Sequence, residues 1–222
     1  MRLVLAVSLD GRLAPARGGA AHLGGPGDRE VLDQALGWAD ACLIGAGTLR
    51  AHRSTCLLRD PVLQRQRRQA GQSEQPIAVV ISHQQAFPQD WLFFRQPMQR
   101  WLLAPEPAAD GFNRWLPLQT TWHERLNALR LAGIRRLVLL GGAQLSAQLF
   151  RADAVDQLQL TLSPRILGGA NSWIPLQTGG LPEALQQPEA WRLEQAQPLQ
   201  DDELMLRYSR RRERASLSRS VR

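Results

Sequence analysis

The feature that most limits the fold is an uncharged apolar run that ends abruptly in two glycines. The run covers residues 137–140, Gly141 and Gly142 follow at once, and a helical apolar pattern begins with Leu145. This order is typical of a buried strand, a tight turn and the amino terminus of a helix. Glycine lets the backbone approach a ligand closely, and the unpaired N–H groups of a first helical turn attract phosphate. The run therefore indicates either a plain turn that closes a buried strand or a phosphate site.

A second copy of this arrangement lies upstream and favours the phosphate site. Residues 41–44 form a short apolar strand, and the segment Gly45-Ala46-Gly47-Thr48 follows, which we interpret as a second glycine turn before a helix. Two such turns at the ends of parallel strands predict one ligand groove across the carboxyl edge of the sheet. Neither turn matches G-x-G-x-x-G, and no acidic residue lies at the distance expected for ribose binding, so an ordinary Rossmann domain is disfavoured.

The remaining patterns predict strands alternating with helices. A helix is expected from Asp28, taken as its N-cap, and a capping box formed by Thr121 and Glu124 predicts another helix that Gly133 ends. The arginine-rich residues 50–75, which include Arg67, are expected to form an exposed loop and a surface helix. Further strands are expected at residues 2–9, 76–81, 100–104 and 157–162, with a hairpin of 191–194 and 204–208 around Asp201-Asp202. The chain is thus expected to be α/β, with a mostly parallel central sheet, helices on both faces and antiparallel C-terminal edge strands.

Size and charge indicate one folded domain followed by a tail. The 222 residues with 44% hydrophobic content suit a single domain over residues 1–208. From Arg207 onward there are seven arginines and one acid, so the tail holds most of the net charge of +7. We expect residues 209–222 to be a disordered basic tail without a function of its own, with contact to RNA or an acidic partner as the less favoured alternative.

Several classes of protein are disfavoured by the composition. No apolar run has the length of a membrane span, no signal peptide begins the chain, and Cys42 and Cys56 fit neither a metal site nor a disulfide framework, so a reducing cytoplasm is expected. The sequence contains no lysine, which excludes a Schiff-base or P-loop lysine. His22 and His52 lie near glycine-rich loops and are candidate pocket residues. Because no nucleophile motif is present, the chemistry is expected to come from a cofactor, and hydride transfer fits this requirement.

The order of five motifs resembles the pyrimidine reductases of riboflavin biosynthesis, in particular the reductase half of the bifunctional deaminase–reductase. The resemblance covers most of residues 2–208 and implies a three-layer dihydrofolate-reductase-like α/β fold, a homodimer, no metal site, and NADPH as cofactor. The implied activity is that of 5-amino-6-(5-phosphoribosylamino)uracil reductase, which reduces a ribosyl group to ribityl. The motifs are Ala6–Gly11, Gly45–Thr48, Val80–Ser82, Gly141–Gly142 and Ser163–Gly169.

The resemblance also implies which residues bind the cofactor. The segment Gly45, Ala46, Gly47 and Thr48 matches the turn beneath the nicotinamide half. The residues that match the turn and helix start that hold the pyrophosphate are Gly141, Gly142, Ala143, Gln144 and Leu145. Ser82 matches the contact to the adenosine end, where Ser82 and His83 can receive a 2′-phosphate.

On the substrate side the chain departs from the family. Arg59 is retained as the candidate for the substrate phosphate, His52 replaces an acidic pocket residue, and Ser8 is a further substrate candidate; Asp10 and His52 are the catalytic candidates. The positions that depart from the family pattern are Val4, His22, Leu36, His52 and Leu140. The departures leave two alternatives open, a reductase of the same fold that acts on another small substrate and a nucleotide-binding relative without activity.

Overall fold

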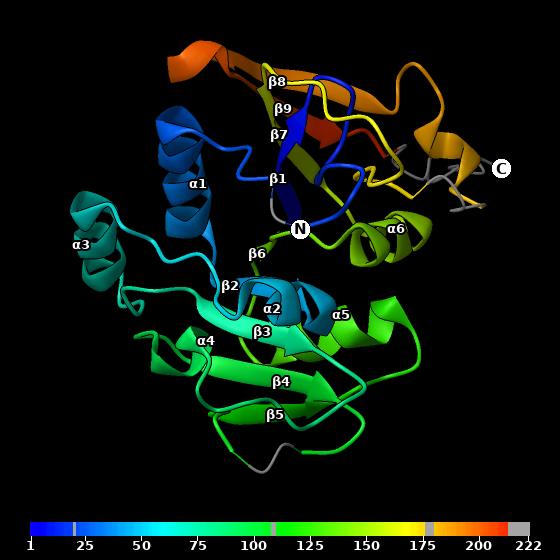
Figure 1. Ribbon diagram of the computed structural model, residues 1–222. Coiled ribbons are helices and arrows are strands. Elements are labelled where there is room, and N and C mark those ends of the chain that lie inside the picture. Colours follow the sequence, from blue (N-terminus) through cyan, green and yellow to red (C-terminus); the bar gives the residue numbers. More distant parts are fainter. Residues whose placement is uncertain (20, 108–109, 176–179, 213–222) are drawn as a thin grey trace, which may run out of the picture.

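The computed structural model describes residues 1–19, 21–107, 110–175 and 180–212, which form one α/β unit around a nine-stranded sheet (Figure 1). The strand order is β5-β4-β3-β2-β6-β1-β7-β9-β8. The strands are β1 (Arg2–Ser8), β2 (Ala41–Gly45), β3 (Ile77–Ile81), β4 (Arg100–Ala104), β5 (Arg114–Pro117), β6 (Leu137–Leu139), β7 (Gln157–Ser163), β8 (Trp191–Pro198) and β9 (Leu204–Arg210). The α-helices are α1 (Pro26–Trp38), α2 (Ala46–His52), α3 (Pro61–Gln69), α4 (Leu92–Arg95), α5 (Trp122–Leu131) and α6 (Ala143–Arg151), with short 3-10 turns η1 (Glu183–Leu185) and η2 (Gln200–Asp202).

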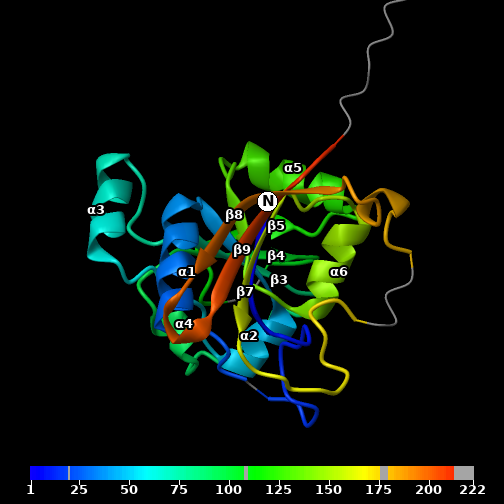
Figure 2. The same cartoon turned by 90° about the horizontal axis from the view of Figure 1, so that it is seen from above.

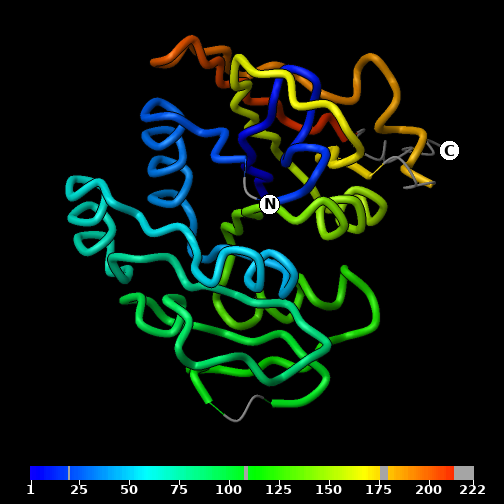
Figure 3. Tube along the Cα trace, in the orientation of Figure 1, coloured from blue at the N-terminus to red at the C-terminus, as the bar shows by residue number. Residues whose placement is uncertain are grey.

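The sheet is parallel from β5 to β7 and ends in two antiparallel strands, β9 and β8. Seen from above, α1 and α3 lie on one side of the strands and α5 and α6 on the other (Figure 2). The trace in Figure 3 shows the C-terminal segments returning beside the first strand, where β7 pairs with β1. The predicted three-layer architecture with antiparallel C-terminal edge strands is confirmed.

Alternation along the strands decides which helices cover which face. Odd-numbered apolar strand residues such as Leu43 and Leu139 pack in one core against α5 and α6. Leu149 of α6 belongs to this core. Even-numbered residues such as Cys42 and Val138 pack on the opposite face against α1. Because successive side chains point to opposite faces, strands that are apolar at every position become buried on both sides.

Helix α1 begins earlier than the sequence pattern indicates. The predicted N-cap, Asp28, is wrong: the N-cap is Gly25, and Pro26 occupies the first helical position, where its missing N–H costs nothing. The buried carboxylate of Glu203, from the segment between β8 and β9, accepts hydrogen bonds from the backbone N–H of Gly25 (2.9 Å) and of Asp28 (3.3 Å). A cap supplied from 175 residues away leaves no local signal in the sequence.

The expectation that Arg67 lies on a surface helix is wrong for its side chain. Arg67 belongs to α3 as expected, but it is buried, and its guanidinium donates hydrogen bonds to backbone carbonyls at the end of α1. Three other predictions for helices and turns are confirmed. Thr121 and Glu124 form the capping box, Gly133 follows α5 with φ +97°, and β8 and β9 form the hairpin around Asp201 and Asp202.

The last strand extends two residues past the predicted domain boundary at 208. Arg210 ends β9 with its side chain only 5% exposed and lies 3.2 Å from Asp153, and Arg212 contacts Asp153 and Asp156. Asp156 also receives the N-terminal amino group. Residues 213–222 lie outside the described residues, so the tail stays a prediction. None of the helices in the described ranges is long and apolar enough to span a membrane.

Truncation tests this boundary. A chain ending at Tyr208 loses Arg210 and Arg212, and we expect it to unfold at a temperature several degrees lower, since about 1–3 kcal/mol of charged hydrogen bonding is removed. A chain ending at Arg212 keeps these contacts and should melt with the full chain in a thermal scan followed by circular dichroism. Equal melting temperatures for both truncated chains would show that the two arginines add no stability.

Candidate functional site

A cleft of about 1390 Å³ lies at the carboxyl ends of the central strands. Its walls come from the ends of β2, β3 and β6, the amino ends of α2 and α6, and the facing strand β1 with the loop that follows it. The volume exceeds the roughly 300–1,000 Å³ typical of a pocket for one drug-sized ligand. The cleft therefore has room for two ligands side by side.

The structure brings all ten predicted cofactor residues into this cleft. They are Gly45, Ala46, Gly47, Thr48, Ser82, Gly141, Gly142, Ala143, Gln144 and Leu145. They come from three segments that are far apart in the chain and meet because β2, β3 and β6 run parallel and end at one edge.

The Gly141-Gly142 pair has a backbone that only glycine adopts without strain. Both residues have φ +95°, and Gly142 is the N-cap of α6 with ψ 99°. A Cβ on Gly142 would lie 3.0 Å from the Thr48 Oγ1 atom, and one on Gly141 3.2 Å from Leu5 Cδ2. No side chain of the described residues caps the amino end of α6. The pair therefore leaves the first N–H groups of α6 facing open space in the cleft.

The second glycine segment is not a turn, contrary to the interpretation of its sequence. Gly45 is the last residue of β2, with φ −77° and ψ 148°, and α2 begins directly at Ala46. A Cβ on Gly47 would meet nothing within 4 Å. A Cβ on Gly45 would make only an ordinary contact, 3.6 Å from Leu145 Cδ2, so neither glycine is required by the fold of this segment.

The adenosine candidate, Ser82, lies just after β3. It is 4% exposed, and its hydroxyl accepts a hydrogen bond from the Gln84 backbone N–H at 2.9 Å. The exposed His83 lines the cleft beside it. Arg125, from the first turn of α5, also lines the cleft and was not anticipated; its guanidinium is held by the carbonyls of Gln119 and Thr120.

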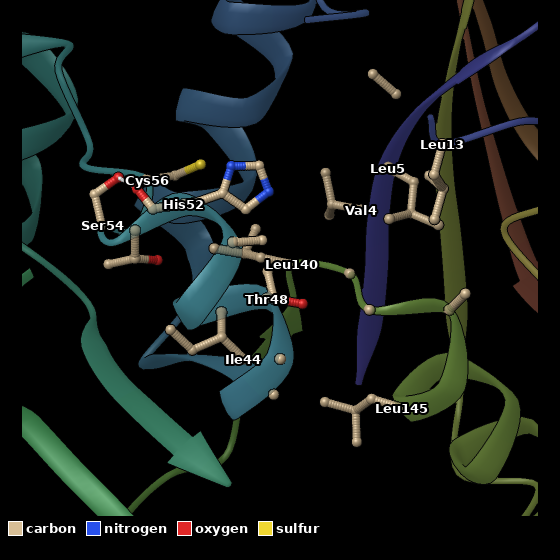
Figure 4. Close-up of a pocket in the computed structure, with 18 of the residues that line it drawn as sticks. Val4, Leu5, Leu13, Ile44, Thr48, His52, Ser54, Cys56, Leu140 and Leu145 are labelled. Atoms are coloured by element: carbon tan, nitrogen blue, oxygen red, sulfur yellow. Dashed lines mark hydrogen bonds between the residues drawn. The ribbon is translucent and has the colours of Figure 1, made fainter. Parts of the chain in front are cut away.

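The other half of the cleft contains the retained and the altered substrate positions. Figure 4 shows His52 reaching from α2 into the cleft, with Val4 and Leu5 of β1 on the facing wall. Arg59 and His22 also line the cleft, as does Leu140 at the end of β6. The apolar side chains of Val4 and Leu140 offer no hydrogen bonds to a polar ligand, so the polar contacts must come from elsewhere.

Three residues that the sequence analysis assigned to the substrate side, Ser8, Asp10 and Leu36, are not among the residues that line the cleft. The fully buried Ser8 donates its hydroxyl to Asp10, and its Oγ accepts the Arg12 backbone N–H at 2.9 Å. Asp10 further accepts the N–H groups of Leu167 and Gly168, and these bonds, led by that of Ser8, lower the pKa of its carboxyl. Both residues order the loop after β1, so they are poor candidates for substrate binding or catalysis. Leu36 belongs to α1 and is fully buried in the core between that helix and the sheet.

One acidic residue of the cleft was predicted only as a helix cap. Asp28, in the first turn of α1, lines the cleft. Its position is visible only after folding, since the sequence around it reads as the start of a helix. Within the described ranges, no three His, Cys, Asp or Glu side chains come together in a way that could hold a metal ion.

Comparison with known proteins gives a consistent result. The model of the family described as RibD C-terminal domain matches residues 1–203. The chain is 23% identical over 178 residues to the 2,5-diamino-6-ribosylamino-4(3H)-pyrimidinone 5′-phosphate reductase of Archaeoglobus fulgidus, covering 76% of this chain and 81% of the relative.

Solved structures agree on the fold. A pyrimidine reductase-like protein from Corynebacterium diphtheriae superposes with a TM-score of 0.76 at 22% identity, covering 96% of this chain and 92% of the other. Dihydrofolate reductase from Enterococcus faecalis, solved with NADP(H), superposes with a TM-score of 0.55 at 12% identity, over 95% of this chain and 96% of the other. The dihydrofolate-reductase-like fold is therefore confirmed.

Proposed function

Because this chain belongs to the RibD C-terminal domain family, we propose that it is a reductase of riboflavin biosynthesis that uses NADPH to reduce the ribosyl group of a phosphorylated pyrimidine to ribityl. The observation that carries this proposal is the meeting of ten cofactor candidates from three segments in one cleft. The relative from A. fulgidus is named as such a reductase.

The cofactor end of the cleft fits a dinucleotide phosphate. The Gly141-Gly142 backbone lets a pyrophosphate approach the amino end of α6, where a side chain on Gly142 would fill the space. Gly45 to Thr48 would lie beneath the nicotinamide half. Ser82 and His83, with the cationic Arg125 nearby in the cleft, would favour the 2′-phosphate of NADPH over NADH.

The cofactor supplies a hydride for the sugar carbon, and the protein supplies position. Holding two reactants in contact replaces a bimolecular encounter with an effectively unimolecular step. The apolar side chains of Val4, Leu5 and Leu140 line the cleft and would lower the polarity around the reacting groups once both ligands are bound. His52 lies where it can contact the pyrimidine or the sugar, and it remains our catalytic candidate.

Two experiments test the proposal. The first follows the absorbance of NADPH when the purified protein is mixed with each phosphoribosylamino-pyrimidine. The second tests whether the gene complements a strain that lacks the pyrimidine reductase. Oxidation of NADPH and restored growth without added riboflavin are expected. If NADPH binds but no substrate is reduced, the protein is a nucleotide-binding relative without activity, an alternative that the apolar Val4 and Leu140 favour. Consumption of NADPH with other small carbonyl compounds only would indicate a different substrate.

Arg59 is proposed to bind the substrate phosphate. It is exposed in the cleft, and its backbone N–H is held by Asp33 at 2.9 Å, so the residue is fixed while its guanidinium reaches the cleft. We expect Arg59→Ala to raise KM for the substrate about 30-fold, because a charged hydrogen bond contributes about 2 kcal/mol. The NADPH Kd should stay unchanged. Arg65→Ala, on the exposed side of α3, is the control; equal KM values for the two variants would remove Arg59 from the site.

A homodimer in the cytoplasm completes the proposal. The edge strand β8 presents the exposed Leu193 and unpaired backbone groups, which favours association of two copies. Light scattering on the purified protein tests the dimer.

A further inference from the structure

Asp28 is a carboxyl group that the mechanism above does not use. It lines the cleft from the first turn of α1 and is half-buried. A Cβ on Gly24 would come within 2.0 Å of the Asp28 Oδ2 atom, so the loop before α1 lies directly against this carboxyl. A larger residue at position 24 would displace the carboxyl from this position.

Neighbouring groups hold Asp28 at the edge of the cleft. The buried carboxylate of Glu203 accepts the backbone N–H of Asp28 at 3.3 Å. The hydroxyl of Thr161, which is 1% exposed on β7, lies close enough to the Asp28 carboxyl to favour its charged form. The backbone of Asp28 is thus fixed, and its carboxyl lies near a buried hydroxyl group, as suits a residue that selects a ligand.

Within the part of the chain that the structure describes, Asp28 has no ion-pair partner, although the charge of the neighbouring Arg29 acts on it. The neighbouring Arg29 directs its guanidinium to Asp33 and to the carbonyl of Leu57. Burial raises the pKa of the Asp28 carboxyl, and the charge of Glu203 adds to the rise. A half-buried carboxylate without a cation costs stability, and donors on a ligand would offset that cost.

Asp28 belongs to the substrate half of the cleft. Asp28 and Arg59 both lie close enough to Cys56 to act electrostatically on its thiol, and all three line the cleft. The glycine segments and Ser82 form the other half. A ligand whose phosphate binds Arg59 would therefore lie in the same half of the cleft as Asp28.

We propose that Asp28 determines which pyrimidine the enzyme accepts, by receiving the ring N3–H and the 2-amino group of a 2-amino-4-oxopyrimidine on its two carboxylate oxygens. This inference rests on the proposed function. The substrate named for the A. fulgidus relative, a 2,5-diamino-pyrimidinone, carries this pair of adjacent donors. The corresponding uracil has a carbonyl in place of the 2-amino group, and that oxygen would face a carboxylate oxygen. The structure thus favours the pyrimidine before removal of its 2-amino group, so a deaminase would act on the product and not on the substrate.

The experiment measures the affinity of both pyrimidine ribosyl phosphates for the NADP⁺-loaded protein by calorimetry, and turnover with NADPH separately. The natural chain should bind the diaminopyrimidinone at least about tenfold more tightly than the uracil, the factor expected for one mismatched charged hydrogen bond. Asp28→Asn should reverse the preference, because an amide donates to the uracil 2-oxygen and accepts from N3–H. Glu30→Gln, at an exposed position two residues further along α1, is the matched control and should keep the natural preference.

A purely structural role for Asp28 predicts a different result. Because its pKa in the folded protein is raised, the stability associated with the protonated carboxyl is lost as pH rises through that pKa. At neutral pH, Asp28→Asn should therefore melt at the same or a higher temperature, whereas a structural cap would make it melt lower. The charged groups that act on Asp28 are Glu203 and Arg29, the titratable Cys56 thiol lies near it, and all three are retained in this variant.

The outcomes separate the two proposals. Equal affinities of the natural chain for the two pyrimidines, or an unchanged preference in Asp28→Asn, would overturn the role of Asp28 even if both compounds are reduced. Preferential binding that Asp28→Asn reverses, without turnover of either compound, would support the role of Asp28 and overturn the proposed reductase activity.

Discussion

Replacing Gly142 by valine is expected to weaken NADPH binding by at least about 100-fold, which corresponds to about 2.8 kcal/mol. Two effects combine. A valine at φ +95° is strained, at a cost of about 1–3 kcal/mol, and relaxation of the backbone would move the amino end of α6. The new side chain would also enter the space beside Thr48, where its Cβ lies 3.0 Å from the hydroxyl oxygen. Fluorescence titration with NADPH measures the loss.

Gly133→Val is the matched control for backbone strain. Gly133 has nearly the same φ, +97°, but it follows α5 outside the cleft, and a Cβ there would meet nothing within 4 Å. This variant should lose stability and keep its NADPH affinity. If both variants lose affinity to the same extent, the effect of Gly142 is general destabilisation and the proposed pyrophosphate site is wrong.

Replacing Arg67 by methionine is expected to lower the free energy of unfolding by about 3 kcal/mol. Its guanidinium donates to the carbonyls of Leu36 (3.3 Å), Gly37 (3.1 Å) and Ala39 at the end of α1, and to that of Ser73 (2.8 Å). Methionine fills a similar volume but removes all four of these hydrogen bonds, and among the described residues only the Leu36 carbonyl keeps a backbone donor, the N–H of Ala39 at 3.2 Å. Burial lowers the pKa of the arginine, yet hydrogen bonds to several carbonyls keep the group in place. Denaturation in urea measures the change.

Two variants make this prediction specific. Arg67→Lys supplies a point charge that cannot reach carbonyls on both α1 and the loop after α3, so it should recover only part of the loss. Arg68→Met removes the neighbouring exposed arginine and its ion pair with Glu74, and should change stability by no more than about 1 kcal/mol. An Arg67→Met protein as stable as Arg68→Met would show that the buried bonds contribute nothing net.

Most of the fold is predictable because its signals are local. The runs that became β1, β2, β3, β4 and β7 are apolar and bounded by turn residues, and Thr121 and Glu124 cap α5 within four residues of each other. The missed elements, β5 and α4, are short and lack such signals. The start of α1 was misplaced because its cap, Glu203, comes from the other end of the chain.

In the candidate site, too, residues with a local sequence signal were predicted well and isolated residues were not. The cofactor residues form contiguous segments after strands, so resemblance to a family identified them together, and the cleft contains them all. The substrate residues are single positions. Ser8 and Asp10 belong to the family motif Ala6–Gly11, yet they hydrogen-bond to each other, and Asp10 also accepts the N–H of Gly168. Asp28 was considered only as a helix cap.

The sequence by itself determined the alternation of strands and helices, the two glycine segments and the family. These depend on the spacing of apolar residues and on backbone freedom, both of which are properties of neighbours in the chain. Only the tertiary structure decided that Arg67 is buried, that Glu203 caps α1, and that Asp28 and Arg59 share one half of a cleft. Such contacts join residues whose separation in sequence carries no information about their distance, because sheet order, not chain order, brings them together.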